Sequence, residues 1–328
     1  MRAPAKASAY YNKRMLAEYY RAATEGAAIT ELDSFGIVKL TGSDRVSWLQ
    51  GMVTNDVEKL APGTGCYAAH LTPQGKLVAQ MNVLKESDAL WLSLERAAIP
   101  GLLAAFDRLL IMEDTQVADV SDDYSILGIL GPRAAGALSS WLGGPLNLQG
   151  LYSHRVVDEC RIVVSQLGYD IWVPRRQVDN VLRSLADHGM TAIDHGTWDV
   201  LRTEAGIPIH GVDIDETTTL PELGEKGISY DKGCYIGQEV VAKVKYIGHV
   251  NRRFVGLVIS GNDLPELKSP IRKGGRDVGY ITTALFSPGL NRPIALGFVN
   301  RSAYAQGNEV EVVTGTATIA GLPFKTSS

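Results

Sequence analysis

Two successive rounds of mixed strand and helix patterns, followed by a tract of strands only, limit most strongly how this chain can fold. In the first round, FGIVKLTGSDRVSWLQG predicts a strand and a short helix that Ser43 caps and Gly51 ends. YAAHLTPQGKLVAQMNVL then predicts a hairpin with its turn at residues 72–75, where proline and glycine stand as a type I turn prefers. DALWLSLE predicts a further strand, and IPGLLAAFDRLLI has helical apolar spacing.

A second round begins near Tyr124. RVVDECRIVVSQ and YDIWVPR predict strands, and RQVDNVLRSLADHG predicts a helix that Gly189 ends. Trp91 and Trp172 stand at comparable points, each at a strand end before a helix, which indicates a duplicated α+β unit. From about Arg252 onward, short β-rich segments separated by glycine predict a small antiparallel barrel or sandwich.

The chain of 328 residues is therefore expected to have four parts. They are an N-terminal extension (1–30), a first α+β subdomain (31–122), a second one (123–250) and a C-terminal β-barrel (251–328). Hydrophobic residues make up 45% of the chain, but no apolar run approaches the roughly 18 residues of a membrane helix. The basic N-terminus has no apolar core, which argues against a secretory signal and leaves a short organelle transit segment as the alternative.

Cysteine usage indicates a reducing compartment, so we expect a cytoplasmic protein. The cysteines Cys66, Cys160 and Cys234 are odd in number and far apart, which argues against a disulfide framework. No Cys-x-x-Cys or Cys-x-x-His spacing occurs, and we predict no metal site. The net charge of -4 gives no general reason to expect nucleic-acid binding.

The segment KGCYIGQEVVAK, residues 232–243, combines the features of a reactive loop. Two nearby glycines predict a loop, with Gly237 as the N-cap of a helix that has Glu239 in its first turn and Lys243 in its last. Cys234 would then lie before a helix N-terminus and near Lys232, and both features favour a thiolate with a lowered pKa. A small buried hydrophobic cysteine is the alternative, and a Cys/His pair of the hydrolase type is also open.

Basic residues are concentrated around this loop. Residues 226–253 hold six basic side chains and two acidic ones. An anionic ligand, a tRNA or another acidic partner would explain the excess, and a solvated helix face is the alternative.

The motif KGCYIGQE followed by Lys243 resembles the signature of the YgfZ family of folate-binding proteins, which are similar in fold to the glycine-cleavage T protein, an aminomethyltransferase. FGIVKLTGSDRVSWLQGMVTNDV, TWDVLRTEAGIPIHGVDI and SPGLNRPIALGFVNRSAYAQGNEVEV resemble blocks of the wider superfamily. The resemblance implies an α+β fold: duplicated ferredoxin-like α/β units that form a T-protein-like folate-binding region, plus a C-terminal antiparallel β-barrel.

The resemblance also implies tetrahydrofolate, or a one-carbon derivative, held at the centre of three domains. Phe35 and Trp198 match aromatic positions associated with folate, and Glu204 matches the pterin-binding glutamate of the superfamily. A carboxylate can accept two parallel hydrogen bonds from a pterin, and aromatic faces can stack on its ring. Considered without the resemblance, the two aromatic residues would be expected in the core.

One departure from the T protein separates two functions. At the positions of its essential aspartate pair this chain has Ala79 and Gln80, which cannot manage a proton as a carboxylate does. The resemblance therefore predicts a folate-binding accessory protein that helps to assemble or repair iron-sulfur clusters in client enzymes, including tRNA-modifying radical enzymes. Cys234 would be its working thiol, with Lys232, Gln238, Glu239 and Lys243 shaping the loop and helix.

Two alternatives stay open. The first is a folate-dependent aminomethyltransferase or demethylase of the T-protein type. The second is a binding module that contacts tRNA or an acidic partner through residues 226–253.

Overall fold

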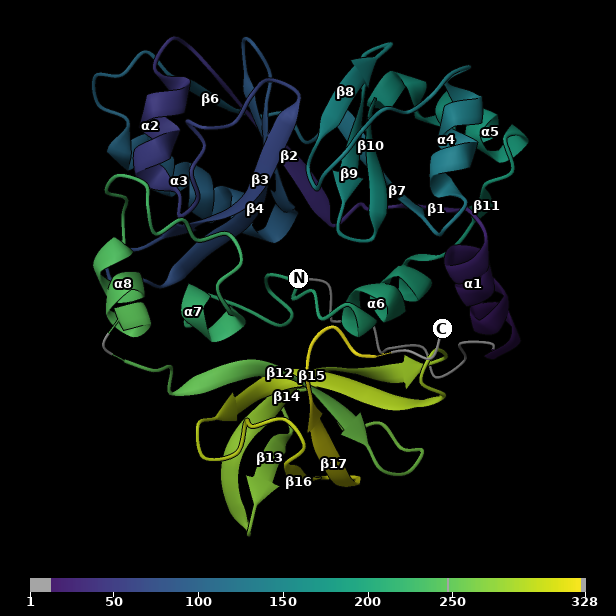
Figure 1. Ribbon diagram of the computed structural model, residues 1–328, viewed down its shortest axis with the longest axis vertical. Helices are drawn as coiled ribbons and strands as arrows, with labels where there is room; N and C mark the ends of the chain where they lie inside the picture. Colours follow the sequence, from purple (N-terminus) through teal and green to yellow (C-terminus); the bar gives the residue numbers. More distant parts are fainter. Residues whose placement is uncertain (1–12, 247, 326–328) are drawn as a thin grey trace.

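Two α/β units lie side by side, and a β-barrel closes the arrangement beneath them (Figure 1). The computed structural model describes residues 13–246 and 248–325. The first unit consists of β2 (Phe35–Thr41), α2 (Arg45–Met52), β3 (Thr64–Leu71), β4 (Leu77–Lys85), β5 (Leu90–Glu95), α3 (Ile99–Leu109) and β6 (Gln116–Asp119). Its sheet has the strand order β3-β4-β5-β2-β6.

The second unit repeats this order of elements. It consists of β7 (Tyr124–Leu130), α4 (Ala134–Trp141), β8 (His154–Val157), β9 (Cys160–Ser165), β10 (Gly168–Pro174), α5 (Val178–Asp187) and β11 (Thr191–Ala192). The sheet order β8-β9-β10-β7-β1-β11 matches that of the first unit, except that β1 (Ala28–Glu31) is inserted. The predicted duplication is confirmed, and Trp91 and Trp172 lie on the equivalent strands β5 and β10.

The N-terminal segment contributes to the second unit, although the first unit follows it in sequence. Helix α1 (Lys13–Glu25) leads into β1, which pairs antiparallel with β7 and parallel with β11. Contacts between strands so far apart in sequence have no local signature. This placement was therefore not foreseen.

Strand alternation explains how each sheet serves two layers. On β2, Val38 and Leu40 pack toward α2 and α3, whereas Ile37 packs in a second cluster with Trp91 and Trp172 between the two units. Each sheet thus buries one face beneath its own helices and turns the other toward its neighbour.

Two local predictions about α2 are wrong in detail. The Ser43 hydroxyl donates to Asp114 at 2.9 Å, so it does not cap the helix, and Asp44 occupies the N-cap position. Gly51 lies inside α2, which continues to Met52. The turn at residues 72–75 is confirmed, because the Gly75 N–H donates to the Thr72 carbonyl at 2.8 Å.

The C-terminal part is a closed antiparallel barrel, as predicted, with the order β12-β15-β14-β13-β16-β17. Its strands are β12 (Arg252–Ile259), β13 (Pro270–Lys273), β14 (Arg276–Ser287), β15 (Arg292–Asn300), β16 (Glu309–Val312) and β17 (Gly315–Ala320). Between the second unit and the barrel, the described chain forms α6 (His195–Glu204), α7 (Leu220–Leu223) and α8 (Gln238–Tyr246).

A buried polar network attaches α6 to the barrel. The Arg202 guanidinium donates to Asp213 at 2.6 Å, and both side chains are almost completely buried. Asp213 also accepts hydrogen bonds from the hydroxyls of Thr282 and Thr283 on β14. Because each partner satisfies the other, the buried charges are tolerated and the orientation of the barrel is defined.

Candidate functional site

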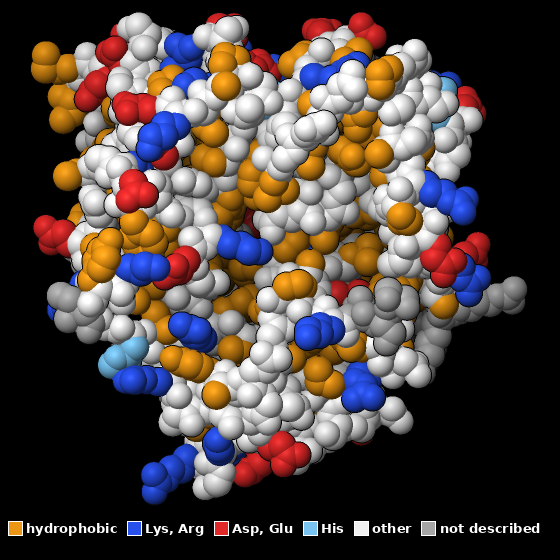
Figure 2. Space-filling model, in the orientation of Figure 1, with side chains coloured by type: hydrophobic (Ala, Val, Ile, Leu, Met, Phe, Trp, Pro, Cys, Tyr) orange, Lys and Arg blue, Asp and Glu red, His pale blue; other side chains and the backbone are white. Residues whose placement is uncertain are grey.

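A cavity of about 1090 Å³ lies where the two units and the barrel meet. Figure 2 shows the hollow on this face, with hydrophobic side chains inside it and basic side chains near its edge. Its wall combines residues of β3, β4, β5, β7, β10 and β12 with the end of α6 and residues 320–323. A cavity of this volume can enclose a cofactor-sized molecule.

Phe35 and Trp198 both line this cavity. Their rings meet edge to face, with centroids 5.8 Å apart, and His195 stacks on Trp198 at 5.2 Å. Trp198 is positioned by α6, which begins at an Asp194 cap whose side chain accepts from the Thr197 N–H at 2.8 Å. The cavity thus has an aromatic wall, and the folate role of these two residues stays a prediction.

Glu204 is not among the residues that line the cavity. Its carboxylate accepts hydrogen bonds from the Tyr20 hydroxyl at 2.8 Å and the Ser287 hydroxyl at 2.5 Å. Burial raises the pKa of Glu204, and these two hydrogen bonds oppose that rise. The carboxylate therefore joins α1, α6 and the barrel, and its position does not favour the pterin contact that we had expected.

Asp170 supplies a carboxyl group to the cavity wall that sequence reasoning missed. On β10, Ile171 and Val173 pack against the helices of the second unit, and Asp170 and Trp172 alternate with them, as the strand period requires. Burial raises the pKa of Asp170 to about 7, although a hydrogen bond with Ser165 opposes the rise. An aspartate in the inward register of an apolar strand was the signal that could have revealed it.

Of the two positions that replace the expected aspartate pair, one faces the cavity. Ala79 is fully buried among the residues beneath α2 and α3, whereas Gln80 lines the cavity. The Tyr67 hydroxyl donates to Gln80 Oε1 at 2.7 Å, and Gln80 Nε2 donates to Glu95 Oε1 at 3.0 Å. Glu95, which the sequence analysis did not single out, also lines the cavity.

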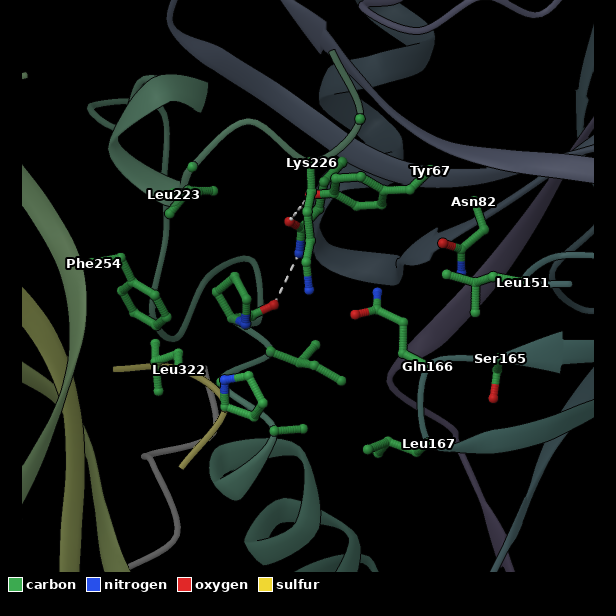
Figure 3. Close-up of a pocket in the computed structure, with 18 of the residues that line it drawn as sticks. Tyr67, Asn82, Leu151, Ser165, Gln166, Leu167, Leu223, Lys226, Phe254 and Leu322 are labelled. Atoms are coloured by element: carbon green, nitrogen blue, oxygen red, sulfur yellow. Dashed lines mark hydrogen bonds between the residues drawn. The ribbon is translucent and has the colours of Figure 1, made fainter. Parts of the chain in front are cut away.

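Lys226 and Arg253 line the cavity on its exposed side. Figure 3 shows the side chain of Lys226 directed into the cavity. The described residues give neither side chain an ion pair with a carboxylate, so both cations can meet an anionic ligand.

Part of the basic excess of residues 226–253 is neutralised locally. Lys245 pairs with Glu225 at 2.8 Å, and Arg252 pairs with Glu222 at 3.0 Å. These pairs reduce the charge that is free to attract an acidic partner. Contact with tRNA stays a prediction.

The contacts of Lys232 give its side chain a structural role. Its ammonium group donates to the backbone carbonyls of Gln50, Val53 and Asn55 at 2.6–2.9 Å, at the C-terminal end of α2. Burial lowers the pKa of Lys232 to about 8. Its contacts satisfy carbonyl groups that the end of the helix leaves without partners.

Packing also accounts for much of the remaining loop. Gly237 has φ +82°, and a Cβ atom there would lie 2.7 Å from the Thr72 carbonyl oxygen, so glycine is required. Gln238 Oε1 accepts from the Tyr235 N–H at 3.3 Å. Cys234 is exposed.

The predicted reactive loop therefore does not reach the cavity. None of Cys234, Lys232, Gln238, Glu239 and Lys243 lines it, and Glu239 and Lys243 are exposed on α8. Within residues 13–246 and 248–325, no ion pair joins Glu239 to Lys243.

A different thiol, Cys66 on β3, faces the cavity. Burial raises its pKa to about 12, which keeps the sulfur protonated near neutral pH. Among the described residues, no group of three or more histidine, cysteine and acidic side chains is placed to hold a metal ion. The described part of the chain also contains no helix with the length and apolar character of a membrane span.

Comparisons with known proteins identify relatives along almost the whole chain. Residues 5–228 match the GCVT N-terminal domain, and residues 252–325 match the glycine cleavage T-protein C-terminal barrel domain. A protein of Thermoanaerobacter pseudethanolicus named aminomethyltransferase is 28% identical over 90% of this chain and 84% of its own length. One of a Nostoc species with the same name is 27% identical over 94% of this chain and 87% of its own.

A solved structure shows the same fold. The glycine cleavage system aminomethyltransferase T of Bartonella henselae superposes with a TM-score of 0.87 and is 20% identical, covering 94% of this chain and 89% of that one.

These findings correct the predicted function. The prediction of an iron-sulfur accessory protein working through Cys234 is wrong, because relatives that align with 90% of the chain are named aminomethyltransferases. The replacement of two aspartates does not remove acidic chemistry from this wall, since Gln80 lies beside a carboxyl group from another strand. Because the match at residues 5–228 alone covers more than half of the sequence, the chain belongs to the family of the glycine cleavage T protein, with its GCVT N-terminal domain and C-terminal barrel domain.

Proposed function

We propose that this protein is a tetrahydrofolate-dependent one-carbon transferase of the aminomethyltransferase type. The observation that carries the proposal is the cavity between the three parts, whose wall combines aromatic rings with inward carboxyl groups. Two relatives that cover at least 90% of the chain are named aminomethyltransferases, which supports the same reaction class.

The polarity of the cavity fits a folate. A tetrahydrofolate has a pterin with adjacent N–H donors at one end and glutamate carboxylates at the other. Asp170, on β10 of the second unit, can accept paired hydrogen bonds from the pterin when it is ionised. Lys226 and Arg253, on the exposed side, can attract the carboxylates. Phe35 and Trp198, which also line the cavity, offer aromatic surface for stacking.

The loop at residues 232–239 is compatible with this ligand. Its motif resembles that of YgfZ-like folate-binding proteins, and we propose that the chain is a YgfZ-like member of the T-protein family. In this proposal Lys232 and Gly237 support the wall of the first unit from outside, through α2 and the β3–β4 hairpin. Tetrahydrofolate itself supplies the nitrogen atoms that accept the one-carbon unit.

Binding and turnover test separate parts of the proposal. Tetrahydrofolate should quench the tryptophan fluorescence of the protein, and Trp198→Phe should remove most of the quenching, because the other four tryptophans do not line the cavity. Asp170→Asn should weaken binding. Incubation with an aminomethyl donor should yield 5,10-methylenetetrahydrofolate and ammonia. Undiminished quenching in Trp198→Phe would place the folate elsewhere, and binding without product from any aminomethyl donor would overturn the transferase.

A further inference from the structure

Gln80 is held by protein contacts on both sides of its amide group. Its Oε1 atom accepts from the Tyr67 hydroxyl at 2.7 Å. Its Nε2 atom donates to Glu95 Oε1 at 3.0 Å and to the Pro208 carbonyl at 2.9 Å. An amide has no proton to exchange near neutral pH, so Gln80 cannot perform acid-base chemistry and instead orients its neighbours.

The strand register places Glu95 between two other residues of the cavity wall. Phe35 on β2 pairs directly with Glu95 on β5. On the other side of β5, Asn82 pairs with Ser93, so the register brings Gln80 opposite Glu95, as their hydrogen bond also requires. The three side chains Phe35, Glu95 and Gln80 form one row across the sheet, and all three line the cavity.

Glu95 is a buried carboxyl group that amide groups contact directly. Its side chain is 4% exposed, and in the described part of the chain it takes part in no ion pair. Burial raises its pKa, while hydrogen bonds from Gln80 and from the backbone N–H groups of Glu95 and His210, together with the positive charge of Arg202, oppose the rise. The Arg202 guanidinium forms its ion pairs with Asp199 and Asp213 and not with Glu95. A buried carboxyl group that no ion pair holds in the ionised form suits a group that exchanges a proton.

We propose that Glu95 on β5 is the catalytic carboxylate of the transfer reaction. It supplies the acidic group that β4 lacks at Ala79 and Gln80. This inference rests on the proposed function. Two nitrogen atoms of tetrahydrofolate attack the methylene carbon in turn. In the first attack, Glu95 accepts the N–H proton as the new C–N bond forms, the bond from the carbon to the amino nitrogen breaks with its electron pair on that nitrogen, and Glu95 returns the proton so that ammonia leaves. In the second attack, Glu95 accepts the other N–H proton as the second C–N bond forms, the bond from the carbon to the rest of the donor breaks with its electron pair on the donor atom, and that atom takes the proton, which restores the carboxylate.

Gln80 is a positioning residue in this scheme. By donating to Oε1 of Glu95, its amide selects the rotamer of the carboxyl group and leaves the second oxygen without a side-chain partner among the described residues. Asp170 lies on β10 of the other unit and pairs with neither Glu95 nor Gln80 through any hydrogen bond of the described residues. The two carboxyl groups can therefore be tested separately.

The isosteric variant Glu95→Gln keeps the size of the side chain and removes its proton chemistry. We expect the dissociation constant for tetrahydrofolate to change by no more than about threefold, and kcat to fall by about 10²- to 10⁴-fold, as for the loss of a general acid-base group. The exchange variant Glu95→Gln/Gln80→Glu returns a carboxyl group to β4 and should recover at least about tenfold of the lost rate. In the wild-type enzyme, kcat should fall on the acid side, and the residual activity of Glu95→Gln should lack that decline.

The possible failures differ. If the wild-type chain forms no 5,10-methylenetetrahydrofolate, the proposed function is overturned. If it turns over and Glu95→Gln retains its kcat and its acid-side decline, only the role of Glu95 is overturned. An equal loss of folate affinity and rate in a folded Glu95→Gln protein, as judged by circular dichroism, would make Glu95 a binding residue and refute the catalytic assignment. If Glu95→Gln does not fold, Gln80→Leu provides the test, because it removes the amide partner of Glu95. A decline of kcat on the acid side that is unchanged from the wild type would then refute the catalytic role of Glu95.

Discussion

Replacing Asp170 by asparagine gives the sharpest test of the folate site. Burial raises the pKa of Asp170 to about 7, so near neutral pH the free protein holds this carboxyl group partly protonated. Only the ionised form can accept two hydrogen bonds from a pterin. The affinity for tetrahydrofolate should therefore rise as the pH rises through the pKa of Asp170.

The size of the effect follows from the ionised fraction. With a pKa of about 7, the carboxylate fraction is about one eleventh at pH 6 and about ten elevenths at pH 8, so the apparent dissociation constant should fall about tenfold between them. Loss of hydrogen bonds to a charged acceptor costs about 1.5–3 kcal/mol, so Asp170→Asn should bind about 10- to 150-fold more weakly at pH 8. Its affinity should also lose the pH dependence.

The free energy of unfolding changes with pH in the opposite direction to the folate affinity. The pKa of Asp170 in the folded state lies above its pKa in the unfolded state, so its stabilising contribution is complete below about pH 4 and is lost as the pH rises through about 7. Asp170→Asn should remove this loss and be relatively more stable above pH 7.

Calorimetric titration with tetrahydrofolate from pH 6 to 8 measures the affinity, and thermal unfolding over the same range measures the stability. Asp263→Asn, an exposed change in the barrel, is the matched control and should behave as the wild type. An asparagine variant that binds at pH 8 as tightly as the wild type would refute the assignment of Asp170 to the pterin.

Three further predictions concern the surroundings of the cavity. Lys232→Met leaves the carbonyls at the end of α2 without their donor and should lower the free energy of unfolding by about 2 kcal/mol. The control Lys243→Met, at an exposed position, should change it by less than about 0.5 kcal/mol. Equal urea midpoints for the two variants would contradict the structural role of Lys232. Asp213→Asn breaks a buried ion pair and should cost about 3–5 kcal/mol, visible as early urea-induced unfolding of the barrel, and a wild-type midpoint would show that the network contributes little. Lys226→Gln and Arg253→Gln should each weaken tetrahydrofolate binding by about twofold to fivefold at low ionic strength and less at high salt. A loss of affinity that does not depend on salt would exclude an electrostatic contact.

Local patterns predicted the elements well where the physical signal is local. The turn at residues 72–75, the duplicated strand and helix order and the closed barrel follow from glycine and proline positions and from side-chain periodicity. Ser43 was misassigned because a hydroxyl that could cap a helix finds a better partner in Asp114, which lies far away in sequence. Strand β1 joins the second sheet for the same reason, because strand pairing is nonlocal.

The candidate site was predicted only in part. Phe35 and Trp198 lie on the cavity, whereas Glu204 and the loop at Cys234 do not line it. Proximity in sequence suggested that Lys232 would act on Cys234, but its ammonium group turns toward the end of α2.

By itself, the sequence determined which segments form strands, helices and turns, because the spacing of apolar residues and the backbone preferences of glycine and proline act over a few residues. It also determined that no acid stands at Ala79 or Gln80. Only the tertiary structure decided that Glu95 lies beside Gln80 and that Asp170 reaches the cavity from the other sheet. Strand register and the packing of the two units bring these groups to one cavity, and burial among distant residues sets their proton affinity.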